Sequence, residues 1–325
     1  MKALVTGGTG FIGSHLVEAL IKRGFEVHCL VRDPARPGWL KGLDVELIRG
    51  DCCRPETLSG VAHGMDYVFH AAGITKTRDA REYYLVNGEG TRNIAEAAAS
   101  EAGGLRKFIY ISSQAAAGPS REGVPRKEDD PPEPVTDYGK SKLLGEKYAL
   151  ALRERFNLAI IRPTAVYGPR DRDIYEFFRI ISRGFRTSFK DERLLSICYV
   201  EDLAEGIILS ALGDTTSGET FFIAEKSNYS WDYLGAAIAE ALGVKARKLV
   251  VPLPVLDVVA VLAEAVSALN GKPALLNRQK VAEIKQRYWV VDTARARERL
   301  NFSARFDFKT GSKLTAEWYR HHGWI

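Results

Sequence analysis

A glycine-rich turn between an apolar strand and a helix, close to the N-terminus, constrains the fold of this chain most. Lys2–Val5 is an apolar run typical of a buried strand, and Ser14–Arg23 has helical periodicity. Between them Gly7, Gly10 and Gly13 recur at every third position. Glycines let the backbone approach phosphate groups, and a helix N-terminus offers unpaired N–H groups. The pattern predicts a dinucleotide pyrophosphate site, with a ligand-free βα turn as the alternative.

A second apolar strand, Phe25–Val31, follows where a βαβ unit would return, and it ends in Arg32. An arginine here can pair with the 2′-phosphate of NADP, whereas an acidic residue would accept hydrogen bonds from the ribose hydroxyls of NAD. Asp33 follows directly. The sequence therefore favours NADP and leaves NAD open. The alternative for Arg32 is a solvated loop arginine that binds no cofactor.

Further strands are expected at Val45–Arg49, Tyr67–His70 and Lys107–Ser112, with helices starting at Pro55 and Asn87. Strands that alternate with helices predict a Rossmann-type α/β fold, a doubly wound parallel sheet with helices on both faces. Ligands of such sheets lie beyond the carboxyl ends of the strands.

Two segments at these strand ends are candidates for cofactor contact. Asp51 could accept a hydrogen bond from the adenine amino group, although a turn-forming aspartate is the alternative. Ala71, Ala72 and Gly73 are small enough to let a cofactor lie against the backbone. His70 is interpreted as a structural histidine at a strand end rather than a catalyst or ligand.

The candidate chemistry lies in two later segments. The strand Lys107–Ser112 leads to Ser113, and a helix carries Tyr138 and Lys142, four residues apart on one face. An ammonium beside a phenol favours phenolate, so the tyrosine could exchange a proton with a substrate alcohol. Lowering a tyrosine pKa to near 7 requires roughly 4 kcal/mol of stabilisation. A tyrosine–lysine pair alone is common on exposed helices.

The order of the motifs makes the case stronger, because together they resemble those of the extended short-chain dehydrogenase/reductases. The matching residues are TGGTGFIG at 6–13, Asp51, HAAG at 70–73, Asn87 with Gly90 and Thr91, Ser113, Tyr138 with Lys142, RPTAVYGPR at 162–170 and YVEDLAEGI at 199–207.

This resemblance implies a role for each matching residue. Tyr138 would be the general acid/base, Lys142 would bind the nicotinamide ribose and lower the tyrosine pKa, and Ser113 would hydrogen-bond the reacting oxygen. The implied cofactor-binding residues are Gly7, Gly10, Phe11, Ile12, Gly13, Arg32, Asp51, Cys52, Ala71, Ala72, Gly73, Asn87, Tyr138, Lys142 and Pro163. A hydride would pass between nicotinamide and a substrate carbon, with a homodimer built on the helices after Asn87 and Tyr138.

The substrate class is argued from two departures. Nucleotide-sugar enzymes of the family commonly carry an arginine, which grips the substrate diphosphate, where this chain has Leu195. Nearby basic residues could substitute, or could form a solvated loop: Arg183, Arg186, Lys190 and Arg193. Ala116, Ala117 and Gly118 stand where many members have V-Y-G, which would widen a pocket. Both features favour an apolar hydroxy or keto compound, with a nucleotide-sugar epimerase or dehydratase as the alternative.

An apolar helix at Val255–Leu269 points the same way. It is too short and too charged to span a bilayer, and we expect it to be a core or pocket-lining helix, with membrane-surface docking as the less favoured alternative. With the following lysine-rich helix and WVVDTARARERL, it resembles the 3β-hydroxysteroid dehydrogenase-like and dihydroflavonol reductase-like branch.

Composition argues against several other classes of protein. A net charge of +5 without a long basic run gives no reason to expect nucleic acid, and the four cysteines lack metal-ligand spacing. No segment reads as a signal peptide, so we expect a cytoplasmic protein. A third function class is a cofactor-binding protein without catalysis, which would act as a redox sensor or a scaffold.

The expected domains are a nucleotide-binding domain at 1–165, which 196–225 partly rejoins, and a smaller, mostly helical substrate lobe at 166–195 and 226–325.

Overall fold

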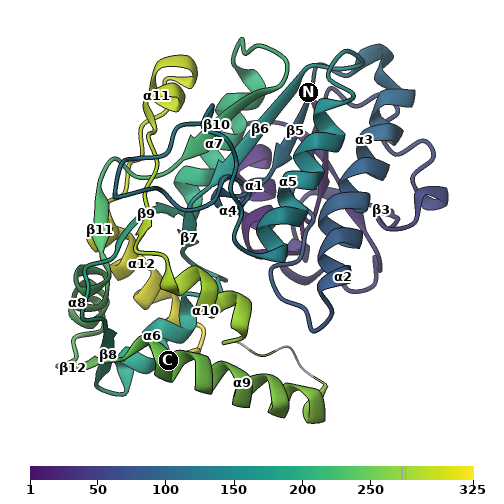
Figure 1. Ribbon diagram of the computed structural model, residues 1–325. Coiled ribbons are helices and arrows are strands. Elements are labelled where there is room, and N and C mark those ends of the chain that lie inside the picture. The colour runs from purple at the N-terminus through teal and green to yellow at the C-terminus, as the bar shows by residue number, and fades with distance from the viewer. Residues whose placement is uncertain (272–273, 275) are drawn as a thin grey trace.

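Seven parallel strands form the central sheet, in the order β10-β6-β5-β4-β1-β2-β3. Figure 1 shows this sheet in the upper part of the molecule, with helices packed around it. The structure is a computed structural model that describes residues 1–271, 274 and 276–325. The strands are β1 Lys2–Thr6, β2 Glu26–Val31, β3 Val45–Arg49, β4 Tyr67–His70, β5 Lys107–Ile111, β6 Leu158–Pro163 and β10 Glu219–Ile223. The predicted Rossmann-type fold is confirmed.

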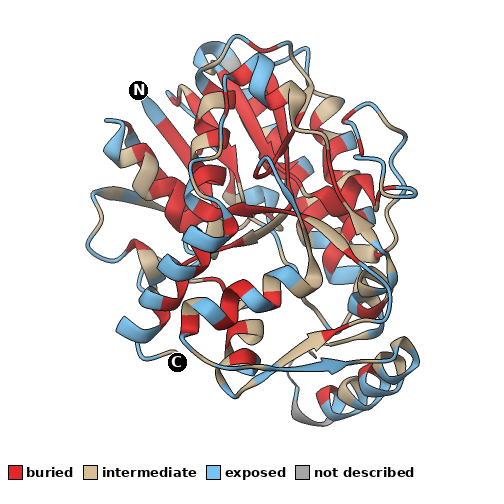
Figure 2. Ribbon diagram, turned by 90° about the vertical axis from the view of Figure 1, so that its left-hand side faces the viewer, coloured by how far each residue is buried: buried red, intermediate tan, exposed pale blue. Residues whose placement is uncertain are grey.

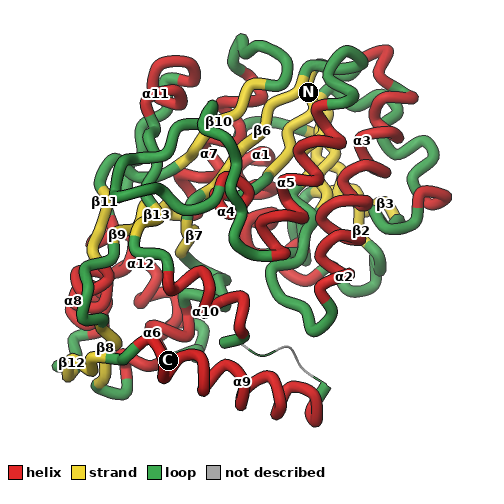
Figure 3. Tube along the Cα trace, in the orientation of Figure 1, coloured by secondary structure: helices red, strands yellow, loops and turns green. Residues whose placement is uncertain are grey.

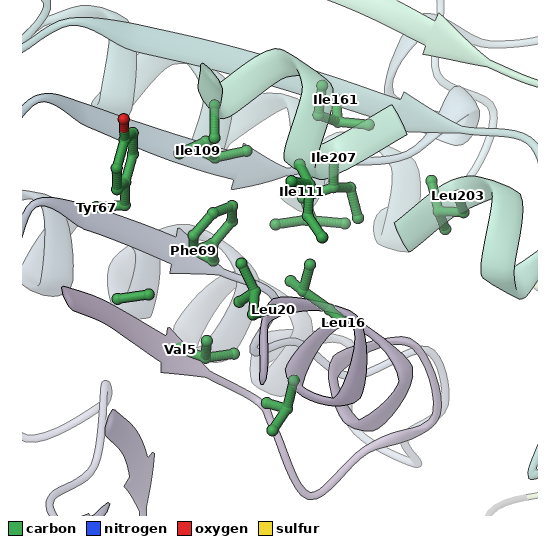
Figure 4. Close-up of a cluster of buried hydrophobic side chains, with 14 of the residues drawn as sticks. Val5, Leu16, Leu20, Tyr67, Phe69, Ile109, Ile111, Ile161, Leu203 and Ile207 are labelled. Carbon is green, nitrogen blue, oxygen red and sulfur yellow. The ribbon is translucent and has the colours of Figure 1, made fainter. Parts of the chain in front are cut away.

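Helices cover both faces of this sheet, and alternate strand residues bury themselves on each face. On one face Val5, Phe69 and Ile109 pack against α1 (Phe11–Lys22) and α7 (Val200–Leu212), as Figure 4 shows. Their neighbours Leu4, Val68 and Phe108 point to the other face. That face is covered by α3 (Gly90–Ser100) and α5 (Asp137–Leu150). Buried apolar side chains therefore anchor the strands on both faces and fix the positions of the strand ends.

The strand order reverses between β1 and β4. In parallel sheets, ligands bind at such a switch point, beyond the carboxyl ends of the strands. The segments after β1, β2, β3, β4, β5 and β6 all start at that edge, because the strands are parallel. Short elements there are η1 Gly38–Leu40, η2 Pro55–Thr57 and α4 Gln114–Ala117, and η4 Ala102–Gly104 follows α3.

The smaller lobe contains a four-stranded sheet, a two-stranded ribbon and helices (Figure 3). The sheet consists of β7 Ala165–Tyr167, β9 Leu194–Tyr199, β11 Asn228–Ser230 and β13 Tyr288–Trp289, and the ribbon of β8 Phe185–Ser188 and β12 Arg247–Val250. Its helices are α6 Tyr175–Ser182, α8 Trp231–Leu242, α9 Leu253–Asn270, α10 Arg278–Lys285 and α12 Phe308–His321. The helix α11 (Ala294–Leu300) packs instead against α7 and against β10 of the central sheet, and its Ala296 and Leu300 belong to the core of that sheet.

Of the two later strands expected to rejoin the central sheet, one does. β10 pairs with β6 at the sheet edge. The strand at 197–200 does not: β9 pairs with β7, β11 and β13 instead. Its side chains Leu195, Ile197 and Tyr199 pack into the core of the smaller lobe. An apolar strand pattern does not specify its partner, so this part of the expected rejoining at 196–225 is wrong.

The helix expected to open at Asn87 begins earlier. α2 (Ala80–Tyr83) leads into a π-helical segment, η3 (Tyr84–Glu89), and Asn87 lies buried inside it. The π-helical turn is common at functional sites because it redirects side chains out of the α-helical register. Periodicity alone does not reveal it.

The apolar helix α9 is not a core helix, contrary to expectation. Figure 1 shows it along the lower edge of the molecule beside α10, away from the central sheet, and Figure 2 shows it largely exposed. Six large apolar side chains of α9 are exposed: Val255, Val258, Val259, Val261, Leu262 and Val266. Apolar composition was the only sign of burial in the sequence, and no element covers this face among the residues described. Within the same residues, no helix is long and apolar enough to cross a membrane.

Candidate active site

The turn after β1 is packed so closely that glycine is required. Gly7 has a φ of +73°, and a Cβ on it would lie 2.6 Å from the backbone nitrogen of Ala72. A Cβ on Gly13 would lie 2.2 Å from the carbonyl oxygen of Gly7. The predicted glycines therefore hold the turn of β1 against the end of β4 and the first turn of α1.

The N-terminus of α1 has the properties of an anion site. Gly10 is its N-cap residue, with no side-chain capping bond, and Phe11 and Ile12 begin the helix without an acidic residue in the first turn. The unpaired N–H groups and the helix dipole therefore face the carboxyl edge of the sheet uncompensated. The glycine-lined turn and this helix end fit the pyrophosphate of a dinucleotide.

At the end of β2, Arg32 and Asp33 have different surroundings. The Asp33 carboxylate accepts a hydrogen bond from the Ala35 backbone nitrogen at 3.1 Å and lies 3.5 Å from Arg36 Nε. Arg32 is exposed and forms no ion pair with any residue that the structure describes. The aspartate is held in a local turn, and the arginine is available to a phosphate.

Asp51 follows β3 and orders its own loop, as the turn-forming alternative predicted. Its Oδ1 accepts a hydrogen bond from the Cys53 backbone nitrogen at 2.9 Å, and Thr57 Oγ1 accepts one from the Asp51 backbone nitrogen at 2.9 Å. Cys52 is buried, and its carbonyl oxygen accepts from Asn93 at 2.8 Å. Asp51 is only partly buried, so its second carboxylate oxygen can still meet a ligand.

Asn87 ties the loop after β4 to the helix α5. Its side chain accepts a hydrogen bond from the Ile74 nitrogen at 2.9 Å and donates to Ile74 O and Ser141 Oγ, both at 3.0 Å. The side-chain oxygen and nitrogen are thus used inside the protein, and they hold the loop at Ile74, with Gly73 packed closely against the Asn87 side chain. His70 is buried between Thr6 and Thr91, and burial lowers its pKa to about 3, so it stays neutral.

Ser113, Tyr138 and Lys142 meet at the carboxyl end of β5. Ser113 follows β5 and caps α4, with Oγ accepting from the Ala115 nitrogen at 3.1 Å. Tyr138 and Lys142 lie in the first turns of α5, which Thr136 caps at 3.2 Å. Gly139 allows α5 to approach α4, since a Cβ there would lie 2.3 Å from Ala115 O.

The electrostatics differ from the sequence-based expectation. Burial raises the pKa of Tyr138 to about 12, and the Ser113 hydroxyl opposes this only in part. Lys142 Nζ donates to Ile111 O at 2.7 Å and lies 4.5 Å from the centre of the Tyr110 ring. Burial lowers the pKa of Lys142 to about 7. Desolvation of the phenol, which residue spacing does not show, is the largest influence on the Tyr138 pKa in this structure.

A buried charge network below the site was missed by sequence reasoning. Glu146, one turn after Lys142, accepts hydrogen bonds from Ser112 Oγ at 2.6 Å and from Arg162 at 2.8 and 2.9 Å. Arg162 is followed by Pro163 at the end of β6. The network joins α5 to β5 and β6, and so fixes the helix that carries Tyr138. The one sign of this network in the sequence was Glu146, four residues after Lys142 on the same helix.

Residues of the smaller lobe close over Tyr138. Gln279 of α10 accepts a hydrogen bond from the Asp137 nitrogen at 2.8 Å and donates to the Asp137 carboxylate at 2.9 Å. Lys76 and Asp173 form an ion pair between the loop after β4 and the segment before α6. The Tyr138 ring itself packs edge-on to Tyr83, with centroids 6.0 Å apart. No motif marked these contacts in advance.

Leu195 stands at the position where nucleotide-sugar enzymes are expected to carry a diphosphate-binding arginine, and it lies in the smaller lobe. Leu195 lies in β9, paired with Tyr229 and Trp289. Of the basic residues considered as substitutes, Arg193 is buried and donates to Ile284 O and Gln286 O, and Arg186 lies near Asp232.

The expected widening of the pocket at Ala116 and Ala117 is wrong. Both alanines are fully buried, and Ala117 packs with Phe222, Ala224 and Val291. The small side chains fit a tight core, which the sequence could not distinguish from an open pocket.

The four cysteines are free thiols, and no cluster of metal-ligating side chains occurs among the residues that the structure describes.

The fold and the site together define an enzyme that binds a nicotinamide dinucleotide at the switch point of a parallel sheet. The model of the NAD dependent epimerase/dehydratase family matches residues 3–224, and the chain belongs to this family.

The chain is similar in sequence to two named relatives and in structure to one solved protein. The chain is 30% identical to a ceramide reductase of Caulobacter vibrioides over 99% of its length and 95% of the relative. It is 29% identical to a human sterol-4-alpha-carboxylate 3-dehydrogenase (decarboxylating) over 77% of its length and 69% of the relative. A UDP-glucose 4-epimerase from Thermotoga maritima has the same fold, with a TM-score of 0.81, 24% identity and coverage of 99% of both chains.

Proposed function

We propose that this chain is a reductase that prefers NADP(H) and acts on a ketone carried by an apolar, lipid-like substrate. The observation that carries the proposal is the placement of Ser113, Tyr138 and Lys142 beside a substrate lobe with an apolar residue, Leu195, at the diphosphate-binding position. A leucine cannot pair with a diphosphate. The names of the ceramide reductase and the sterol dehydrogenase support the same substrate class.

Tyr138 is the proton donor of the proposed reduction. Burial raises its pKa to about 12, so the phenol carries its proton at neutral pH. A protonated phenol can donate to the carbonyl oxygen of a ketone, and Ser113 can hydrogen-bond the same oxygen. Lys142 would hold the nicotinamide ribose, and the bound cofactor supplies the hydride.

The preference for NADP is supported by Arg32. It lies at the end of β2, exposed, while Asp33 is engaged with Ala35 and Arg36. The guanidinium matches a 2′-phosphate in shape and charge. The family itself is NAD-dependent, so NAD is the alternative cofactor.

Calorimetric titration with NADP(H), NAD(H), UDP-glucose and UDP-galactose separates the proposal from the epimerase alternative. We expect exchangeable NADP(H) and no binding of either UDP-sugar. Tightly retained NAD together with binding of both UDP-sugars would instead support an epimerase that recycles its cofactor in place.

A further inference from the structure

The helix α9 has its apolar face outward, the reverse of an ordinary surface helix. Over residues 253–268, every exposed residue is apolar: Pro254, Val255, Val258, Val259, Val261, Leu262, Ala265, Val266 and Ala268. Exposure reaches 60% at Val258 and 62% at Leu262. Single exposed apolar residues are ordinary, whereas a contiguous stripe marks a binding surface.

The two carboxylates of α9 are partly exposed, with side-chain exposures of 48% at Asp257 and 31% at Glu264, and both are paired with cations of α10. Asp257 pairs with Lys285 at 2.7 Å, Glu264 pairs with Arg278 at 2.7 Å, and Ser267 is buried. Because each carboxylate already has a cationic partner, an apolar phase that covers the neighbouring apolar side chains would not desolvate an unpaired α9 carboxylate.

The ribbon just before α9 adds apolar and basic side chains. Leu249 and Val250 of β12 and Phe185 of β8 are 46%, 57% and 44% exposed. Three exposed basic residues, Arg183, Lys245 and Arg247, lie along the same ribbon, and none forms an ion pair with a residue that the structure describes. They outnumber the two exposed carboxylates of the following turn, Asp191 and Glu192. We call α9 and this ribbon the docking face.

The helix α10 connects the docking face to the site. Its Arg278 and Lys285 bind α9, and its Gln279 makes two hydrogen bonds to Asp137, next to Tyr138. Among the residues that the structure describes, α10 thus contacts both α9 and the start of the catalytic helix α5.

We propose that the docking face binds the surface of an anionic lipid bilayer, with α9 lying in the interface and the ribbon cations contacting phosphate headgroups. The proposal rests on the proposed function, because a lipid-like ketone partitions into membranes. The alternative occupant, a second copy of the chain in a symmetric dimer, would bring the same cations near each other, which is unfavourable. Apolar burial and headgroup attraction both favour a bilayer.

Vesicle co-sedimentation tests this with the full chain and without cofactor or substrate. We expect binding to mixed phosphatidylcholine–phosphatidylglycerol vesicles and much weaker binding to phosphatidylcholine alone. Val258→Glu/Leu262→Glu and, separately, Lys245→Glu/Arg247→Glu should each lower the partition coefficient by at least about tenfold. The matched control is Leu212→Glu, which changes an exposed leucine of α7 that is 42% exposed. It should bind as the wild type does.

The proposal is overturned if the wild type binds neither kind of vesicle, or if the α9 variant and the control bind equally. It is also overturned if light scattering shows a dimer that Val258→Glu/Leu262→Glu dissociates in the absence of lipid. Reduction of a water-soluble short-chain ketone is measured in parallel. Vesicle binding without turnover of any ketone would refute the proposed function alone, whereas turnover without binding would refute the docking face alone.

Discussion

The helices α1 and α9 are both rich in apolar residues, yet the protein uses them in opposite ways. Leu16, Val17 and Leu20 of α1 are fully buried against the strands, whereas α9 presents Val258 and Leu262 to the outside. The α1 helix is buried because the strands that flank it in sequence return to the same sheet. Among the described residues no strand returns beneath α9, which contacts α10 instead. The contrast shows that apolar content becomes a core only where the topology supplies a partner.

The largest expected effect is on kcat, and it tests whether proton transfer takes place at Tyr138, at the carboxyl edge of the central sheet. Tyr138→Phe removes the proton donor and should lower kcat by about 10³-fold with little change in cofactor affinity. Steady-state kinetics and cofactor titration check both parts. The control is Tyr148→Phe on the same helix, whose hydroxyl donates to Glu89 at 2.8 Å on the protein surface. Full activity in Tyr138→Phe would refute the assignment.

The buried and exposed regions should also differ in their ion pairs. Glu146→Gln leaves the Arg162 charge buried without its partner and should cost about 3–5 kcal/mol of unfolding free energy. Glu205→Gln, in the half-exposed pair with Arg23, should cost less than about 1 kcal/mol. Urea denaturation measures both, and equal losses would contradict the role given to the network.

A matched pair of leucine truncations tests the comparison of the helices directly. Leu16→Ala in α1 should lower the free energy of unfolding by about 2–5 kcal/mol, because it opens a cavity in the core. Leu262→Ala in α9 should change it by no more than about 0.5 kcal/mol. If Leu262→Ala proved as costly in urea denaturation, the helix would have an intramolecular partner.

The pH dependence of stability tests the burial of Lys142. Its pKa in the folded protein is lowered to about 7 from an ordinary 10.5, so between these values the unfolded chain binds more protons. The wild type should therefore gain stability relative to Lys142→Met as the pH rises from 7 to 9, by up to about 2.7 kcal/mol. Below pH 7 the difference should be constant. Denaturation of both proteins at each pH checks this, and a flat difference would mean that Lys142 is not desolvated.

The smallest expected effect concerns the cofactor. Arg32→Ser should raise the KM for NADPH about tenfold and leave that for NADH nearly unchanged, since it removes one charge-assisted contact. Arg36→Ser, which removes the exposed arginine beside Asp33, is the control. An equal effect on both cofactors would assign Arg32 a structural role.

The sequence was most informative where function imposes residue types at fixed spacing. The glycines at 7, 10 and 13, the strand ends, and Ser113, Tyr138 and Lys142 could all be placed, because a phosphate-binding turn and a sheet edge restrict both chemistry and order. What could not be predicted depends on tertiary packing. Examples are the burial that raises the Tyr138 pKa, the partners of β9, the Glu146–Arg162 network and the exposure of α9.

Hydride transfer followed with NADPH deuterated at the reactive carbon of its nicotinamide tests the central claim most directly. The labelled cofactor is incubated with a long-chain keto lipid in one reaction and with UDP-glucose in another, and the products are analysed by mass spectrometry. We predict deuterium on the carbinol carbon of a lipid alcohol and unchanged UDP-glucose. Unlabelled lipid, together with conversion of UDP-glucose to UDP-galactose by enzyme that retains its cofactor, would contradict the account.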